Sequence, residues 1–102
     1  MSEPKVSFSS LIQSEQPVLV DFYADWCGPC HAMAPVLREL AAEMKDKVNI
    51  IKVDVDKNPQ VAQAYEIMGI PTFIIFQEGK IKWRKSGAMP KSILKNAIEQ
   101  LA

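Results

Sequence analysis

Residues 18–30 read VLVDFYADWCGPC, and this stretch decides the fold. Its first six residues are mostly apolar, and branched or aromatic side chains of this kind are typical of a buried β-strand. The two cysteines that follow stand three residues apart at the expected start of a helix, where side chains at this spacing lie on one side. The stretch therefore predicts an α/β domain with a chemically active turn between a strand and a helix.

The sequence around this stretch alternates between helical and strand patterns. Helices are expected over residues 7–13, 29–45, 59–67 and 91–101, and strands over residues 18–23, 48–55, 72–76 and 81–85. Pro35 predicts a kink in the second helix, because proline removes a backbone donor. Asn58 is expected to cap the third helix, and Glu78-Gly79 predicts a hairpin turn.

The expected order of these elements predicts how they pack. A strand, a helix and a second strand form a βαβ unit with parallel strands, and the hairpin adds antiparallel ones. Residues 18–23 and 48–55 both read as buried strands, so helices are expected to cover both faces of the sheet. The first helix is expected to place Phe8, Leu11 and Ile12 on one side, and the last helix to place Ile93, Leu94, Ala97, Ile98 and Leu101 on one face. We therefore expect one domain over residues 1–102 with three α/β/α layers around a mixed sheet of four to five strands.

Composition and charge exclude several functional classes. The 102 residues include 12 basic and 12 acidic side chains, one histidine and two cysteines. A net charge of zero provides no basic field for nucleic acid or an anionic membrane. No apolar run approaches the roughly 20 residues that span a bilayer. The N-terminal residues do not resemble a signal peptide, so a cytoplasmic location is expected, where a cysteine pair is seldom structural.

The position of the two cysteines predicts different roles for them. Cys27 is expected at a helix N-terminus, where unpaired N–H groups and the helix dipole favour a thiolate. A thiolate is the nucleophile in disulfide exchange. Pro29 suits the first helical turn, and Cys30, one turn further in, is expected to be more buried. The pattern predicts an attacking Cys27 and a resolving Cys30.

Three other interpretations of the pair are open at this point. Half of a zinc site is one, but the chain offers only a single histidine and no further cysteine as ligands. Residues 27–31 also match the C-x-x-C-H pattern of covalent haem attachment, which usually occurs in exported chains. A purely structural disulfide is the third, although closing so short a loop removes little chain entropy.

The five residues 26–30 resemble the active-site sequence of the thioredoxin family. The resemblance covers about residues 17–102 and extends through Asp21, Pro35, Lys52, Gly69-Ile70-Pro71-Thr72 and Gly87-Ala88. It implies a thioredoxin fold, with an N-terminal edge strand for which only Lys5-Val6 is suited. It also implies a dithiol–disulfide oxidoreductase that reduces protein disulfides and contributes to cellular redox homeostasis. Such a protein binds no cofactor, acts as a monomer on disulfide-containing client proteins, and is recycled by a separate thioredoxin reductase that draws on NADPH.

Two charged residues stand inside apolar runs. The flanks of Asp21 predict a buried carboxyl group with a raised pKa, which suits a general base. The resemblance implies that Asp21 deprotonates Cys30 through water, and that Lys52 lies near the aspartate and modulates its titration. The other interpretations are a solvated aspartate at the strand end and a lysine at the sheet edge with its ammonium group in solvent.

The resemblance also implies which residues bind the substrate. Pro71 follows a cis peptide bond, packs against the cysteine pair and leaves the backbone of Ile70 free to pair with an extended peptide. Gly87 lets the substrate backbone approach closely. An apolar rim is expected from Trp26, Gly28, Pro29, Met68, Ile70 and Ala88. For Met68, a core-filling role is an equal alternative.

Two further residues distinguish this sequence. His31 either adds positive charge beside the thiols when protonated, which raises the redox potential, or is an exposed helix residue with little effect. Ser86 stands where thioredoxins more often have an apolar residue, which makes the docking surface more polar.

Two other functions are compared with disulfide reduction. The first is a non-catalytic module that binds partners in the same groove. The second, an oxidase or isomerase, is disfavoured by Gly28-Pro29, because oxidants of the family more often carry a histidine there.

Overall fold

The computed structural model describes residues 7–101, and within them helices and strands alternate as expected. The elements are α1 (Phe8–Leu11), β1 (Val18–Tyr23), α2 (Gly28–Ala32), α3 (Ala34–Glu43), β2 (Asn49–Asp54), α4 (Pro59–Ala64), β3 (Thr72–Gln77), β4 (Lys80–Ser86) and α5 (Lys91–Glu99). The edge strand expected at Lys5 and Val6 lies outside the described residues.

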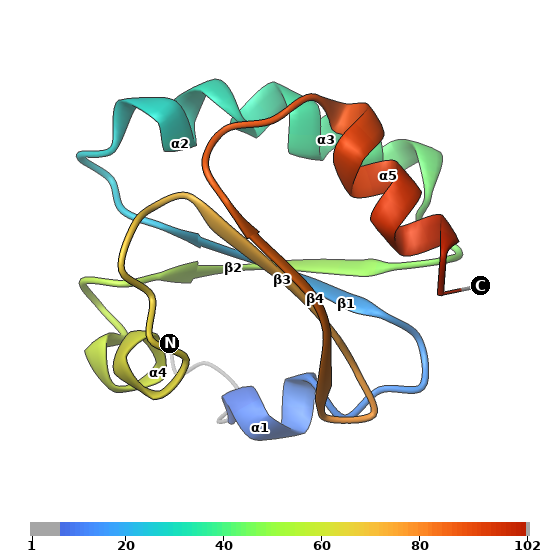
Figure 1. Ribbon diagram of the computed structural model, residues 1–102, viewed down its shortest axis with the longest axis horizontal. Helices are drawn as coiled ribbons and strands as arrows, with labels where there is room; N and C mark the ends of the chain where they lie inside the picture. Colours follow the sequence, from blue (N-terminus) through green and yellow to red (C-terminus); the bar gives the residue numbers. More distant parts are fainter. Residues whose placement is uncertain (1–6, 102) are drawn as a thin grey trace, which may run out of the picture.

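The four strands form one mixed sheet in the order β2-β1-β3-β4. β1 pairs with β2 in parallel and with β3 in the antiparallel direction, and β3 and β4 form an antiparallel hairpin. Helices α2, α3 and α5 cover one face of the sheet, and α1 and α4 lie on the other (Figure 1). The predicted three-layer α/β/α fold with a mixed sheet is confirmed.

Alternation along β1 divides the hydrophobic core between the two faces. Leu19 packs with Leu37 and Leu40 of α3, whereas Val18 and Val20 pack in a separate cluster against α1 and α4. Successive side chains of a strand point to opposite faces. Asp21 therefore shares the face of Leu19, the side covered by α2 and α3.

The hairpin turn has the geometry that its sequence predicts. Glu78 and Gly79 have φ values of 54° and 82°, and both lie in the left-handed region. Two such residues form the turn type whose twist matches antiparallel strands.

The second helix is divided where its proline predicts a kink. α2 ends at Ala32 and α3 begins at Ala34, with Pro35 in the first turn of α3. Proline has no N–H to continue the α2 hydrogen-bond ladder, and it is well tolerated at the start of a helix.

Several details of the structure differ from what the sequence suggested. β2 is an edge strand on which Asn49 and Lys52 are exposed, because β1 is its only strand partner within residues 7–101. Asn58 is the N-cap residue of α4, but its side-chain amide donates to the Asp54 carbonyl instead of accepting from the helix. Leu11 and Ile93, which belong to the expected apolar faces of the first and last helices, are each 38% exposed.

Candidate active site

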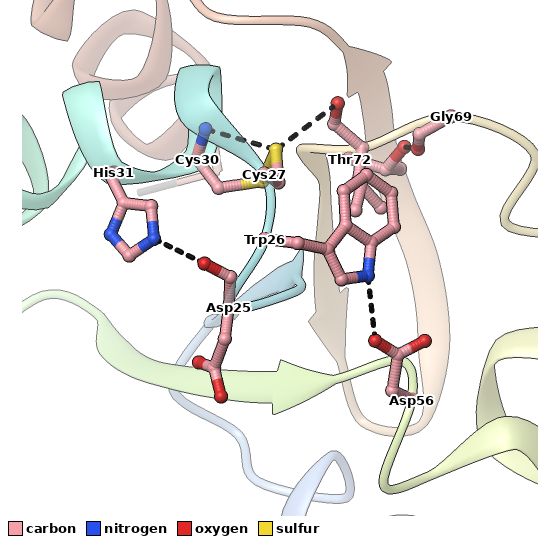
Figure 2. Close-up of a disulfide and its surroundings, with 9 residues drawn as sticks. Asp25, Trp26, Cys27, Cys30, His31, Asp56, Gly69 and Thr72 are labelled. Carbon is pink, nitrogen blue, oxygen red and sulfur yellow. Dashed lines mark hydrogen bonds between the residues drawn. A yellow bond between two sulfur atoms is a disulfide. The ribbon is translucent and has the colours of Figure 1, made fainter.

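Cys27 and Cys30 form a disulfide at the junction of β1 and α2, with their Cα atoms 5.3 Å apart (Figure 2). Cys27 is the N-cap residue of α2, and the Cys30 backbone N–H donates to the Cys27 sulfur at 3.2 Å. In the reduced protein, a backbone donor and the start of a helix at this sulfur favour its thiolate form. The local geometry therefore suits Cys27 as the nucleophile.

Both cysteines are buried, and the expectation that Cys30 is the more buried one is wrong. Cys27 is 4% exposed and Cys30 is 7% exposed. Cys27 is covered from a distant segment, because Val55 and Ile70 pack against the pair. The Cys27 sulfur lies 3.8 Å from the Ile70 carbonyl oxygen.

The segment that covers Cys27 contains the expected proline. The Ile70–Pro71 peptide bond is cis. Pro71 is buried, and its carbonyl accepts a hydrogen bond of 2.7 Å from the backbone N–H of Gly87. This hydrogen bond places Gly87 beside the segment that lies against the disulfide.

A pocket of about 400 Å³ opens beside the disulfide. Five residues expected in the apolar rim are brought together in its wall, namely Trp26, Gly28, Pro29, Met68 and Ile70. Cys27 also lines the pocket, as do three residues that sequence reasoning missed, Val55, Ile67 and Gly69. Ala88, the sixth residue expected in the rim, does not line this pocket, and neither does Gly87. Their contacts with a substrate stay predictions. We call this pocket the active-site groove.

Two large apolar side chains that line the groove are exposed to solvent. Trp26 is 71% exposed and Met68 is 94% exposed. The core-filling alternative for Met68 is therefore excluded. Exposed apolar side chains grouped around a pocket are typical of a surface that binds another molecule.

The indole of Trp26 is held by a residue that the sequence did not single out. Trp26 Nε1 donates to Asp56 Oδ2 at 2.8 Å (Figure 2). Asp56 lies in the turn after β2, where the buried side chain of Asp54 accepts from the backbone N–H groups of Asp56 and Lys57. This turn therefore fixes the carboxylate that orients the indole.

Asp21 is a buried carboxyl group on the sheet face covered by α2 and α3. Its residue is 2% exposed, and Oδ1 has no hydrogen-bond partner among the described residues. Burial raises the pKa of Asp21 to about 6, and the positive charge of Lys52 lowers it by a smaller amount. The solvated alternative is therefore wrong, and the raised pKa suits proton transfer near neutral pH.

Lys52 satisfies parts of both interpretations made from the sequence. It is the register partner of Asp21 across the parallel strands, as expected of a lysine that modulates the titration of the aspartate. Its side chain nevertheless lies at the exposed edge of the sheet, and its ammonium group sits 4.4 Å from the centroid of the Tyr23 ring. Such a cation–π contact holds the ammonium group in place.

His31 spans the active-site turn. Its backbone N–H donates to the Cys27 carbonyl. Its Nε2 lies 2.6 Å from the Asp25 carbonyl oxygen (Figure 2). Because a carbonyl oxygen only accepts, Nε2 must carry the proton of this hydrogen bond. His31 is exposed, as one interpretation expected, but its ring ties the end of α2 to the residues that precede Cys27.

Residues 7–101 contain no group of three or more histidine, cysteine, aspartate or glutamate side chains arranged to hold a metal ion. None of the helices in this part of the chain has the length and apolar character needed to cross a membrane.

Comparisons with known proteins agree with the fold and the site. The family model described as Thioredoxin matches residues 2–100. Thioredoxin Y2, chloroplastic, from Arabidopsis thaliana is 48% identical over 94 residues, which are 91% of this chain and 56% of that protein. The bifunctional thioredoxin reductase/thioredoxin of Mycobacterium leprae is 46% identical over 87 residues, which are 85% of this chain and 19% of that protein.

A solved structure extends the agreement to three dimensions. The crystal structure of mitochondrial thioredoxin 3 from Saccharomyces cerevisiae, in its oxidised form, superimposes with a TM-score of 0.83 at 34% identity. The match covers 91% of this chain and 86% of the yeast chain. The chain spans about half the length of the curated plant relatives that it matches. The family match, these similarities and the cysteine pair together show that the chain belongs to the thioredoxin family.

Proposed function

We propose that this chain is a protein-disulfide reductase that works by dithiol–disulfide exchange through Cys27 and Cys30. The observation that carries the proposal is the Cys27–Cys30 disulfide in the wall of an apolar groove. A redox pair beside a groove suits a client disulfide that is presented by a protein chain.

The reaction has two exchange steps. The Cys27 thiolate attacks one sulfur of the client disulfide, so the client S–S bond breaks and a mixed disulfide forms. The client sulfur that leaves in this step takes up a proton. The Cys30 thiol then loses its proton to Asp21 through water and attacks the Cys27 sulfur. The mixed disulfide breaks, and the second client sulfur leaves as a thiolate that takes up a proton. Two electrons pass to the client, and the Cys27–Cys30 disulfide remains.

The surroundings of the pair support the remaining roles. The Cys30 N–H at the Cys27 sulfur supports thiolate formation, and the burial of Asp21 supports its role as a base. Trp26, Met68 and Ile70 offer apolar contacts to the client chain. We further propose that the backbone of Ile70 pairs with an extended client segment, a mode of recognition used by exposed strand edges. The place of Ile70 in the groove wall supports this role.

The oxidised pair must be reduced again before another cycle. We propose a flavoprotein thioredoxin reductase as the partner, with NADPH acting only through that enzyme and no cofactor bound by this chain. The name of the Mycobacterium leprae relative supports this partner, because it joins a thioredoxin reductase and a thioredoxin in one protein. That the protein is a monomer and that it is located in the cytoplasm both stay predictions from the sequence.

Reduction of insulin with dithiothreitol as the electron source tests the proposal. The wild-type protein is expected to accelerate the reaction, and Cys27→Ser is expected to abolish the acceleration. Cys30→Ser is expected to accumulate a mixed disulfide with insulin, detectable by mass spectrometry. Acceleration by Cys27→Ser, or no trapped complex with Cys30→Ser, would contradict the assigned roles. The geometry gives no separate support to the non-catalytic binding module.

A further inference from the structure

Residues 65–71 contain the four residues that form one wall of the active-site groove, and we call this segment the docking loop. The loop contributes Ile67, Met68, Gly69 and Ile70 to the groove. It begins where α4 ends, at Tyr65, and continues through Glu66, which has a φ of 53°. A segment outside regular structure needs other groups to hold its backbone in place.

Arg84 of β4 holds the start of the docking loop. Its Nη1 donates to the Tyr65 carbonyl at 2.5 Å, and its Nη2 donates to the Glu66 carbonyl at 2.8 Å. The last carbonyls of a helix lack intrahelical partners, and a cation is favourable at this end of the helix dipole. The planar guanidinium group reaches two carbonyls at once, which the single ammonium group of a lysine does not reproduce.

A chain of two hydroxyl groups holds the other end of the loop. The buried Thr72 hydroxyl donates to the Gly69 carbonyl at 2.5 Å, and it lies 2.8 Å from the Ser86 hydroxyl. A hydroxyl group has one proton, and that of Thr72 is used at Gly69. The Ser86 hydroxyl must therefore donate to the Thr72 hydroxyl. These two successive hydrogen bonds connect Ser86 of β4 to the Gly69 carbonyl of the docking loop.

Both anchors come from the same strand. Arg84 and Ser86 stand two residues apart on β4, so their side chains leave the same face of the strand. Through them the carbonyls of residues 65, 66 and 69 are tied to β4. The next carbonyl of the loop, that of Ile70, faces the Cys27 sulfur instead.

We propose that Arg84 and Ser86 are positioning residues for protein clients, because they hold the docking loop in the place where it receives the client chain. This inference rests on the proposed reductase function. From the sequence alone, Arg84 reads as part of a solvated charged strand face, and Ser86 as a more polar patch of the docking surface. The hydrogen bonds instead indicate that both residues hold the backbone of the docking loop.

The proposal predicts a difference between large and small substrates. A protein disulfide needs the groove as well as the cysteine pair, whereas a small disulfide needs only access to the Cys27 sulfur. Loss of an anchor is therefore expected to weaken the reaction with a protein client more than the reaction with a small disulfide.

The experiment measures one turnover of the pre-reduced protein after removal of the reductant. The protein is mixed with excess insulin or excess hydroxyethyl disulfide, quenched with iodoacetamide and analysed by mass spectrometry. Arg84→Lys is expected to raise the half-saturating insulin concentration about tenfold, as expected when a hydrogen bond from a charged group is lost. Its rate with hydroxyethyl disulfide is expected to stay within about twofold of the wild type.

Matched variants separate positioning from general effects. Lys82→Met removes one positive charge from the same strand and is expected to behave as the wild type with both substrates. Ser86→Ala is expected to raise the half-saturating insulin concentration about twofold, as for a neutral hydrogen bond. Ser86→Thr keeps the hydroxyl group and is expected to restore the wild-type value.

Two results would overturn the proposal. One is an Arg84→Lys protein with the half-saturating insulin concentration of the wild type. The other is an equal loss with insulin and with hydroxyethyl disulfide, which indicates a general defect of the fold or of the cysteine pair. If the proposed function is wrong, the wild-type protein reduces neither insulin nor hydroxyethyl disulfide. That result is distinct from the two above, and it would also contradict the positioning role.

Discussion

Asp21 and Lys52 are register partners across the parallel β1–β2 pair, but only the aspartate is buried. The ammonium group of Lys52 lies over the ring of Tyr23, 4.4 Å from its centroid. The two charges form no ion pair within hydrogen-bonding distance among the described residues. Lys52 therefore only partly offsets the burial that raises the pKa of Asp21 to about 6.

This burial predicts that Asp21→Asn stabilises the oxidised protein at neutral pH. Below about pH 3 the carboxyl group is protonated in the folded and unfolded states. Between its unfolded pKa of 3.8 and its folded pKa of about 6, the unfolded state ionises first, so the wild type loses stability as pH rises. Above this range the loss stays constant at about 3 kcal/mol. Urea unfolding of the wild type and of Asp21→Asn between pH 4 and pH 8 measures the difference in their unfolding free energies. At pH 7 this difference is expected to be on the order of the loss just given, about 3 kcal/mol.

Asp46→Asn serves as the control for this prediction, because Asp46 is exposed and far from the cysteine pair in the sequence. Its stability is expected to follow the wild type across the same pH range. An Asp21→Asn protein that is less stable than the wild type at pH 7 would contradict the buried, uncompensated carboxylate.

Lys52→Met is expected to raise the pKa of Asp21 further. The positive charge of Lys52 favours the ionised carboxylate and so lowers this pKa, and methionine removes the charge while keeping most of the aliphatic stem. An NMR titration of the Asp21 carboxyl carbon measures the midpoint directly. Lys45→Met removes an exposed charge outside the site and is expected to leave the midpoint in place. An unchanged or lower midpoint in Lys52→Met would show that Lys52 does not act on Asp21.

Asp56→Ala is expected to release the indole of Trp26. The hydrogen bond between Trp26 Nε1 and Asp56 is exposed, so its loss is expected to cost only about 0.5–1 kcal/mol of unfolding free energy. The indole N–H is expected to exchange with solvent faster, which proton NMR measures. Asp56→Asn keeps an oxygen acceptor and is expected to retain slower exchange. Equal exchange rates in the wild type and Asp56→Ala would mean that the carboxylate does not hold the ring.

His31→Leu tests the hydrogen bond that crosses the active-site turn. Loss of the Nε2 donor at the Asp25 carbonyl is expected to lower the unfolding free energy of the oxidised protein by about 0.5–1.5 kcal/mol. His31→Gln offers a side-chain amide donor and is expected to recover most of that loss in urea unfolding at pH 7. If glutamine and leucine destabilise the protein equally, the ring acts by its shape and not as a donor.

The elements that were predictable are those with a local signal. Residues 18–23 were expected to form a strand, and β1 has these bounds, because an uninterrupted run of branched and aromatic residues favours a buried strand. Glu78-Gly79 predicted the hairpin, since both residues tolerate the left-handed backbone that the turn requires. β2 was placed correctly, but its exposure was not, because an apolar run does not reveal that a strand has a neighbour on one side only.

The candidate site divides in the same way. The cysteine pair and the loop around Pro71 were found from short motifs, whose residues are adjacent in the sequence. Asp56 and Arg84 were missed, because their partners lie far away along the chain: Trp26 is 30 residues from Asp56, and Glu66 is 18 residues from Arg84. The pairing of such residues depends on how the strands and loops are brought together.

The sequence by itself determined the α/β alternation, the hairpin, and a two-cysteine redox pair at the start of a helix. Each of these follows from the conformational preferences and chemistry of residues within a few positions of one another. Only the tertiary structure decided how deeply Cys27 is covered, that Lys52 lies over Tyr23, and which residues hold the docking loop. Burial and hydrogen bonding at these places arise from contacts between distant segments, and no local pattern of residues specifies those contacts.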